Sequence, residues 1–134
     1  MHRRLFLTAA AIMPIAGCDN MKKKDQTSRL DQSLRAYVGS IRWANFDTAA
    51  AFAVPRSGAN TVSPASLQGI KVTGYSVQIK SVNETADEAS VHLNFSYYDE
   101  AGGTVGAIDQ DATWYLDENR KGWLMDDSLP RFKR

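Results

Sequence analysis

Two aspartates in the C-terminal third of the chain have a spacing that suits general acid–base chemistry. Asp109 and Asp111 are two residues apart in a stretch that alternates like a β-strand, so their side chains lie on one face. When two carboxyls lie close together, the pKa of one of them rises, and that group can act as a general base. Both aspartates are out of phase with the apolar residues Ile108, Ala112 and Trp114. This phase favours a solvated strand face over a catalytic pair.

A metal or cofactor site is not indicated by the remaining reactive side chains. His92 is the only histidine beyond residue 2, and it alternates with Ser90 and Asn94 on the polar face of a predicted strand. One histidine without nearby cysteines or suitably spaced carboxylates is a poor metal site, so we expect an exposed strand residue. The chain has no P-loop, no HExxH, no GxSxG and no dinucleotide-binding glycine pattern. We therefore expect no metal and no cofactor.

Cys18, the only cysteine, follows a segment with the plan of an export signal. Arg3 and Arg4 supply a positive start, residues 5–16 are an apolar run, and Ala16 and Gly17 are small. This three-part plan is typical of a secretory signal peptide that is removed from the mature protein. The apolar run is shorter than the about 20 residues that a membrane-crossing helix needs.

The four residues Ile15-Ala16-Gly17-Cys18 resemble the lipobox of bacterial lipoprotein signal peptides. The resemblance implies that Cys18 becomes the lipidated first residue, and that the protein is anchored in a bacterial cell membrane on its periplasmic side. An ordinary signal peptide followed by a buried cysteine is the alternative. Residues 3–7 also resemble the core of a twin-arginine signal, so the general and twin-arginine export routes both remain open. The choice between inner and outer membrane remains open as well.

The mature chain is expected to be one domain behind a short tether. We assign residues 1–17 to the signal peptide, polar residues 18–27 to the lipidated tether, and residues 28–132 to a single domain. Loss of Arg3 and Arg4 with the signal leaves 14 basic against 15 acidic residues, a net charge of −1. Because there is no basic stripe, we expect no nucleic-acid partner.

Helical periodicity in this domain gives way to strand alternation after residue 69. An apolar stripe predicts a long helix from Ser28, and Asp47 is expected to cap a second short helix through Phe52. The loop 55–69 leads to strands near 70–79, 89–97, 104–116 and 123–125. The alternation changes parity at Thr73-Gly74, which predicts a β-bulge. The helical stripe consists of Leu30, Leu34, Tyr37, Val38 and Ile41. These elements predict an α+β fold, with the N-terminal helices packed on a bent antiparallel sheet.

The order of elements is similar to that of nuclear transport factor 2-like domains. Residues 41–52 resemble their helix–break–helix opening, and residues 114–126 resemble their last hairpin, whose closing strand starts at a Gly-Trp pair. The resemblance implies a cone-shaped roll with a pocket at its open end. It covers isomerases and dehydratases as well as many binding domains. In the isomerase-like members an acid in the pocket acts as base, with tyrosine and a second acid as oxyanion donors. Here Tyr75 and Tyr97 could supply the hydroxyls.

Two functions are consistent with these features. The first is a non-catalytic binding or interaction module for an envelope protein or a small apolar ligand. The alternative is a small isomerase- or dehydratase-like enzyme, with Asp109 or Asp111 as general base beside Tyr97. The aromatic side chains could line a pocket, but a core of this size needs most of them. They are Trp43, Phe46, Phe52, Phe95, Tyr97, Trp114 and Trp123.

The lipid anchor makes a direct prediction. A Cys18→Ser variant of the full chain is expected to lose labelling by a fatty-acid analogue, because the hydroxyl cannot take the thioether-linked lipid. It is also expected to move from the membrane fraction to the soluble fraction. Fractionation and labelling of cells that express either form check both points. Membrane association that persists in the Cys18→Ser variant would contradict lipidation.

Overall fold

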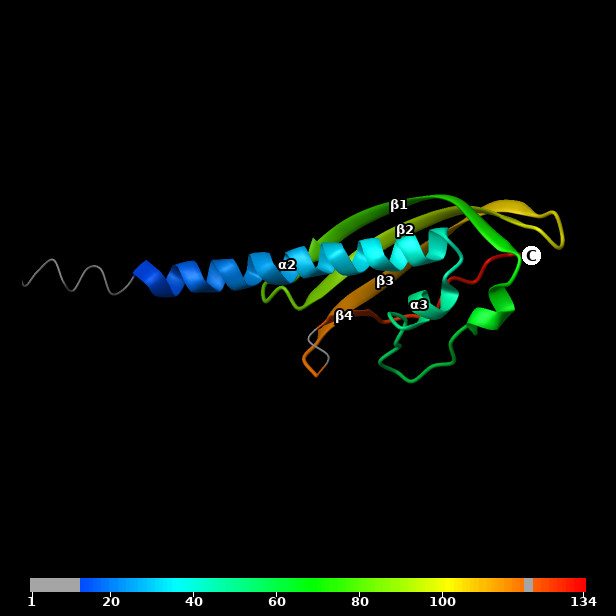
Figure 1. The fold of residues 1–134 in the computed structure, drawn as a ribbon. Helices are drawn as coiled ribbons and strands as arrows, with labels where there is room; N and C mark the ends of the chain where they lie inside the picture. The colour runs from blue at the N-terminus through cyan, green and yellow to red at the C-terminus, as the bar shows by residue number, and fades with distance from the viewer. Residues whose placement is uncertain (1–12, 120–121) are drawn as a thin grey trace, which may run out of the picture.

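The described residues form an antiparallel sheet whose inner face is covered by helices. The computed structural model describes residues 13–119 and 122–134. Strands β1 (Ile70–Val82), β2 (Glu88–Asp99), β3 (Val105–Asp117) and β4 (Gly122–Met125) are neighbours in the order β1-β2-β3-β4. Helix α2 (Met13–Arg42) runs along the bent sheet, α3 (Phe46–Ala50) lies beside it, and a 3₁₀ turn (Pro64–Leu67) leads into β1 (Figure 1). This is the expected α+β fold.

The helical stripe is the side of α2 that meets the sheet. Leu30, Leu34, Tyr37 and Ile41 are all buried, which confirms the helical period found in the sequence. On the opposite side of the helix, ion pairs one turn apart add support, such as Arg35 with Asp31 at 3.0 Å.

Helix α2 begins well before the stripe and includes the segment expected as a polar tether. Residues 18–27 are helical and continuous with the rest of α2. Lysines are good helix formers, and Asp25 pairs with Arg29 at 3.2 Å across one turn. The indole Nε1 of Trp123 in β4 also donates a 2.9 Å hydrogen bond to the backbone oxygen of Gln26. Residues 18–27 therefore form a helical extension of α2 that contacts the sheet at Gln26, while residues 20–25 before it are exposed.

The predicted signal peptide lies largely outside the described residues, so lipidation of Cys18 stays a prediction from the sequence. Within residues 13–119 and 122–134, no helix is long and apolar enough to cross a membrane.

The chain reverses between α2 and α3 through a left-handed residue. Ala44 has φ 61°, and the amide of Asn45 reaches back to the oxygen of Ser40 at 2.8 Å, which closes the last turn of α2. Asn45 then occupies the N-cap of α3 without a side-chain hydrogen bond. Asp47, expected as the cap, lies in the first turn instead, where its carboxylate still faces the positive end of the helix.

The strand register confirms the predicted bulge. The pairing of β1 with β2 shifts between Val72 and Gly74, where the alternation in the sequence changes parity. A second shift, between Ile79 and Ser81, was not predicted. Beyond the first bulge β1 is exposed along its length, while β2 alternates cleanly between buried and open residues.

The core is aromatic where α2 crosses the sheet. The ring of Tyr37 meets that of Trp114 edge-on at 5.5 Å and that of Phe52 at 6.2 Å. Trp43 departs from the expectation that it belongs to the core, because it lies in the turn after α2 and is 71% exposed. The guanidinium of Arg42 stacks 4.5 Å from the centre of its ring instead.

The contact between β4 and α2 predicts that substitution of Trp123 lowers the stability of the fold more than substitution of Trp43 does. Trp123→Phe removes the hydrogen bond to Gln26 and part of a buried ring, so we expect the free energy of unfolding to fall by about 2 kcal/mol. Hydrogen exchange of the amides near Gln26 should also become faster. The matched control Trp43→Phe alters an exposed ring and should change stability by less than about 0.5 kcal/mol. Denaturant unfolding measures both variants, and equal losses would contradict the docking of the helical extension.

Candidate functional site

The predicted catalytic residues are not brought together. Asp109 and Asp111 lie on the outer face of the sheet, with side chains 61% and 64% exposed. Tyr97 is buried on the inner face, and its hydroxyl donates to the backbone oxygen of Lys133 at 2.7 Å. Tyr97 and the two aspartates lie on opposite faces of the sheet because side chains alternate along a strand. The inner-face residues of β2 pair with even-numbered residues of β3, such as Phe95 with Ile108, whereas both aspartates are odd-numbered.

The two aspartates instead hold a histidine on the outer face. His92 has Nδ1 2.7 Å from Asp111 Oδ1 and Nε2 3.3 Å from Asp109 Oδ1. Asn94 Nδ2 donates to the same oxygen of Asp109 at 2.9 Å. The hydrogen bond with His92 holds the pKa of Asp111 below its usual range. A general base near neutral pH needs a raised pKa, so this geometry favours a structural hydrogen bond over a catalytic role for Asp111.

His92 is therefore half-buried between carboxylates, where the sequence indicated a plain exposed position. In the described part of the chain, no three histidine, cysteine or acidic side chains are grouped so as to hold a metal ion.

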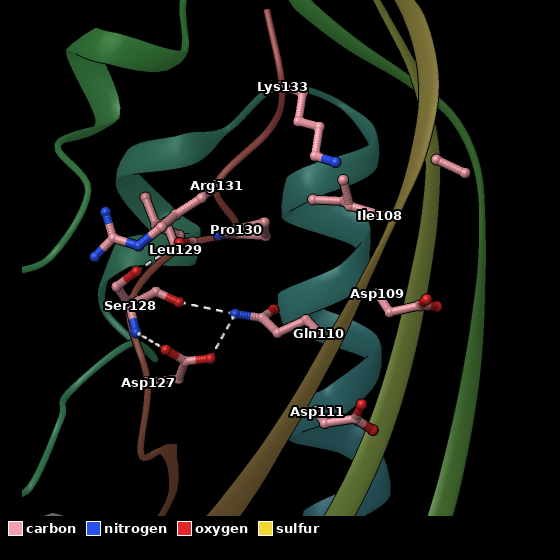
Figure 2. Close-up of a pocket in the computed structure, with 11 residues that line it drawn as sticks. Ile108, Asp109, Gln110, Asp111, Asp127, Ser128, Leu129, Pro130, Arg131 and Lys133 are labelled. Carbon is pink, nitrogen blue, oxygen red and sulfur yellow. Dashed lines mark hydrogen bonds between the residues drawn. The ribbon is translucent and has the colours of Figure 1, made fainter.

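A cleft with a volume of about 520 Å³ lies between β3 and the C-terminal end of the chain. We call residues 126–134 the C-terminal strap. The cleft exists because β4 pairs only with residues 114–117 of β3, which leaves the first half of β3 without a strand neighbour on that side among the described residues. The strap runs past this edge, and Gln110 reaches across the gap, while Asp109 and Asp111 point away from it (Figure 2).

A polar relay forms the floor of the cleft. Gln110 Nε2 donates to the backbone oxygen of Ser128 at 2.9 Å and to Asp127 Oδ2 at 3.3 Å (Figure 2). On the core side of Gln110, the hydroxyl of Tyr37 in α2 donates to Gln110 Oε1 at 2.9 Å. Burial, and then the charge of Asp127, raise the pKa of Tyr37 far above its usual range, so the phenol stays neutral. The relay joins α2, β3 and the strap.

The strap is held at both ends by arginine–aspartate pairs. At its start, Asp126 accepts from the backbone amide of Arg56 at 2.8 Å and from its Nε at 3.0 Å. At its end, the Arg134 guanidinium donates to both oxygens of Asp99 at 3.1 Å and to the backbone oxygens of Ser66 and Gln68 at 2.6 Å. Bidentate pairs of this kind are geometrically specific, so the strap is a fixed wall of the cleft.

These pairs shift the ionisation of both aspartates. The Arg134 hydrogen bonds hold the pKa of Asp99 below its usual range, and the Arg56 amide does the same to the pKa of Asp126. Both carboxylates therefore remain charged in mildly acidic solution.

Sequence reasoning missed the residues that build this cleft. Gln110 is in phase with Ile108 and Trp114, on the core face of β3, and a lone polar residue on a core face is a detectable signal. Asp127 and Arg134 carry no such signal, because they lie in an irregular segment whose partners are distant in the sequence.

The fold is that of a nuclear transport factor 2-like cone, with helices packed on an antiparallel open sheet. The crystal structure of a ketosteroid isomerase-like protein from Erwinia carotovora atroseptica is similar to it, with a TM-score of 0.50 and 14% sequence identity. The similarity covers 75% of this chain and 90% of that chain. At this identity the likeness shows the fold alone. The chain matches no protein-family model and has no significant match among curated proteins.

The Asp99–Arg134 pair predicts how the stability that this contact contributes depends on pH. Because the folded pKa of Asp99 lies below the unfolded value of about 3.9, its contribution to stability is complete above that value. It is lost as the pH falls through the folded pKa. The difference in Tm between the parent chain and Asp99→Asn should therefore be largest near pH 7 and shrink below about pH 4. The exposed control Asp109→Asn should show a smaller effect at pH 7. A Tm difference for Asp99→Asn that is independent of pH would contradict the pairing.

Proposed function

We propose that this protein is a lipid-anchored binding module of the bacterial cell envelope, held in the membrane through a lipid on Cys18. The lipobox-like sequence supports the anchor. The helical extension supports a rigid attachment: eight residues separate Cys18 from Gln26, and a helix of that length spans about 12 Å. Figure 1 shows the C-terminal end of the strap at the opposite end of the molecule from the start of α2. The anchored protein would present its cleft away from the membrane.

The cleft beside the strap is the observation that carries the binding function. Its volume of about 520 Å³ suits a small ligand or a short protein segment. Ile108, Leu129 and Pro130 supply apolar walls, and the amide of Gln110 supplies a fixed polar floor. Arg131 and Lys133 add positive charge along the strap. We therefore propose a partly apolar ligand or a segment of an envelope protein as the occupant.

An isomerase- or dehydratase-like enzyme is the second candidate, and one feature of the cleft favours it. Asp127 and Tyr37 approach the same Gln110 side chain from opposite sides, so a carboxylate and a neutral phenol share one site. An enzyme of this kind would use Asp127 as its base, in place of Asp109 or Asp111. Against this reading, Asp127 already accepts from the amide of Ser128 at 2.7 Å. We therefore favour binding.

Photocrosslinking from the cleft tests the binding function. A benzophenone amino acid at position 133, on the strap, is expected to capture a ligand or protein segment in intact cell envelopes, because the side chain of Lys133 lines the cleft and is directed towards Ile108 (Figure 2). The control position, Val105, is 80% exposed at the start of β3 and outside the cleft, so a crosslinker there should not capture the same ligand or segment. Mass spectrometry of the adducts checks this. Equal adducts at both positions would contradict a binding site in the cleft.

The catalytic alternative is tested on the same purified chain. A β,γ-unsaturated ketosteroid serves as the probe, and conversion to the conjugated ketone is followed by ultraviolet absorbance. The binding proposal expects no turnover above the uncatalysed rate. Turnover that is abolished in Asp127→Asn but retained in Asp109→Asn and Asp111→Asn would establish the enzyme and overturn the non-catalytic proposal.

A further inference from the structure

Strand β1 has an open edge with free backbone groups. Among the described residues it pairs only with β2 and is the first strand of the sheet. The amide of Asp99 donates to Thr104 O at one end of the β2–β3 hairpin, and Asp87 O accepts from Leu116 N at the other, so the odd-numbered residues of β2 face β3. The backbone groups of the even-numbered residues therefore face β1, where their partners are Gly74, Ser76 and Gln78. Tyr75, Val77 and Ile79 alternate with these three residues. Their backbone N–H and C=O groups therefore point away from β2, out of the edge of the sheet. Such an edge is a template for another strand.

The same three residues form an apolar row beside this edge. Tyr75, Val77 and Ile79 are 48%, 41% and 36% exposed, and they lie on the inner face because they pair with Phe95, Leu93 and Val91. The exposure of this row is unusual, because the inner-face residues of β2 that pair with it are buried. Backbone donors and an apolar side-chain row thus occur at the same positions.

A hollow lies at each end of the row. One, of about 320 Å³, is lined by Arg42, Trp43 and Lys71 near the first bulge. The other, of about 510 Å³, is lined by Lys24 and Ile79 among residues of α2. From Thr73 to Ile79 an extended chain covers about 20 Å, so the edge can take a strand of about six residues. We call the row and the hollow at each of its ends the β1 groove.

The positive charge of the β1 groove distinguishes between two possible occupants, a second copy of β1 and a segment that carries carboxylates. Arg42, Lys71 and Lys24 lie along it. Lys80 projects from the outer face of β1, where its Nζ lies 3.9 Å from Asp111 Oδ1. The acidic residue of the groove, Asp31, is already paired with Arg35. A second copy of β1, paired antiparallel about Val77, would bring its own Lys80 opposite Gly74, towards Lys71 and Arg42. Like charges placed together disfavour this pairing, whereas carboxylates there are favoured.

We infer that the β1 groove binds an extended segment of a partner protein by strand addition, and that this segment has aliphatic side chains on one face and carboxylates on the other. The segment continues the sheet beyond β1 through the open groups of Tyr75, Val77 and Ile79. Its aliphatic face lies beside the apolar row, and its carboxylates meet Lys71 and Lys80. Trp43 is an anchor at one end, because an exposed tryptophan under an arginine has the composition of an interface hot spot.

A pair of synthetic peptides tests this inference on the purified full chain. One peptide of about nine residues alternates valine with glutamate, and the other alternates valine with lysine; both carry a fluorophore for anisotropy. We expect the acidic peptide to bind at least about tenfold more tightly than the basic one, with an affinity that falls as salt is added. Hydrogen exchange should slow at the amides of Tyr75, Val77 and Ile79 in the complex.

Two variants locate the site. Val77→Pro removes one open donor without breaking a bond to β2, and edge strands tolerate proline, so binding should weaken about tenfold. Ile79→Glu places a like charge in the apolar row and should weaken binding by a similar factor even if the proline variant is unstable. Val105→Pro makes the same change on the outer edge of β3 and should leave binding unchanged.

Three outcomes would overturn the inference. They are equal binding of the acidic and basic peptides, affinity for the acidic peptide that is unaffected by both Val77→Pro and Ile79→Glu, and a dimer of the chain that Val77→Pro dissociates. The last would show that a second copy occupies the groove. None of these outcomes bears on the cleft beside the strap, which involves β3 and not β1.

Discussion

The hydrogen bond from Tyr37 to Gln110 is the interaction on which this structure depends. It joins α2 to β3, and through Gln110 it continues to Ser128 in the strap, so one buried relay connects all three parts of the domain. Its members lie in a core that is otherwise apolar. An unsatisfied amide or phenol there would cost about 1–3 kcal/mol, so the strap has to lie where it can accept from Gln110. The position of the strap then creates the cleft.

The lengths of the strands decide where the open surfaces lie. Because β4 is only four residues long, most of β3 has no strand neighbour along the edge that faces away from β2, among the described residues. The cleft opens along this edge. Because β1 continues past the first bulge as an edge strand whose residues are exposed, the β1 groove lies along it. Aromatic side chains fill the space between α2 and the centre of the sheet. The open surfaces therefore lie at the edges of the sheet, while its centre is closed.

Local sequence patterns predicted the elements well but not where they meet. The stripe on α2, the alternation of β2 and the bulge near Gly74 all follow from side-chain period, which local sequence determines. The helical extension through residues 18–27 was missed because its support is partly distant: Trp123 is far along the chain from Gln26. Trp43 was assigned to the core by composition, yet the reversal at Ala44 leaves it in solvent.

The sequence by itself determined the order and type of the elements, the phase of each strand, and the export and lipidation signals predicted at its start. It also indicated that Asp109 and Asp111 share a solvated face, because parity along one strand is a local property. Only the tertiary structure decided that Gln110, Asp127 and Tyr37 form one site, or that Arg134 closes on Asp99. Those contacts depend on strand register and on the path of an irregular segment. Neither has a local period that a sequence can display.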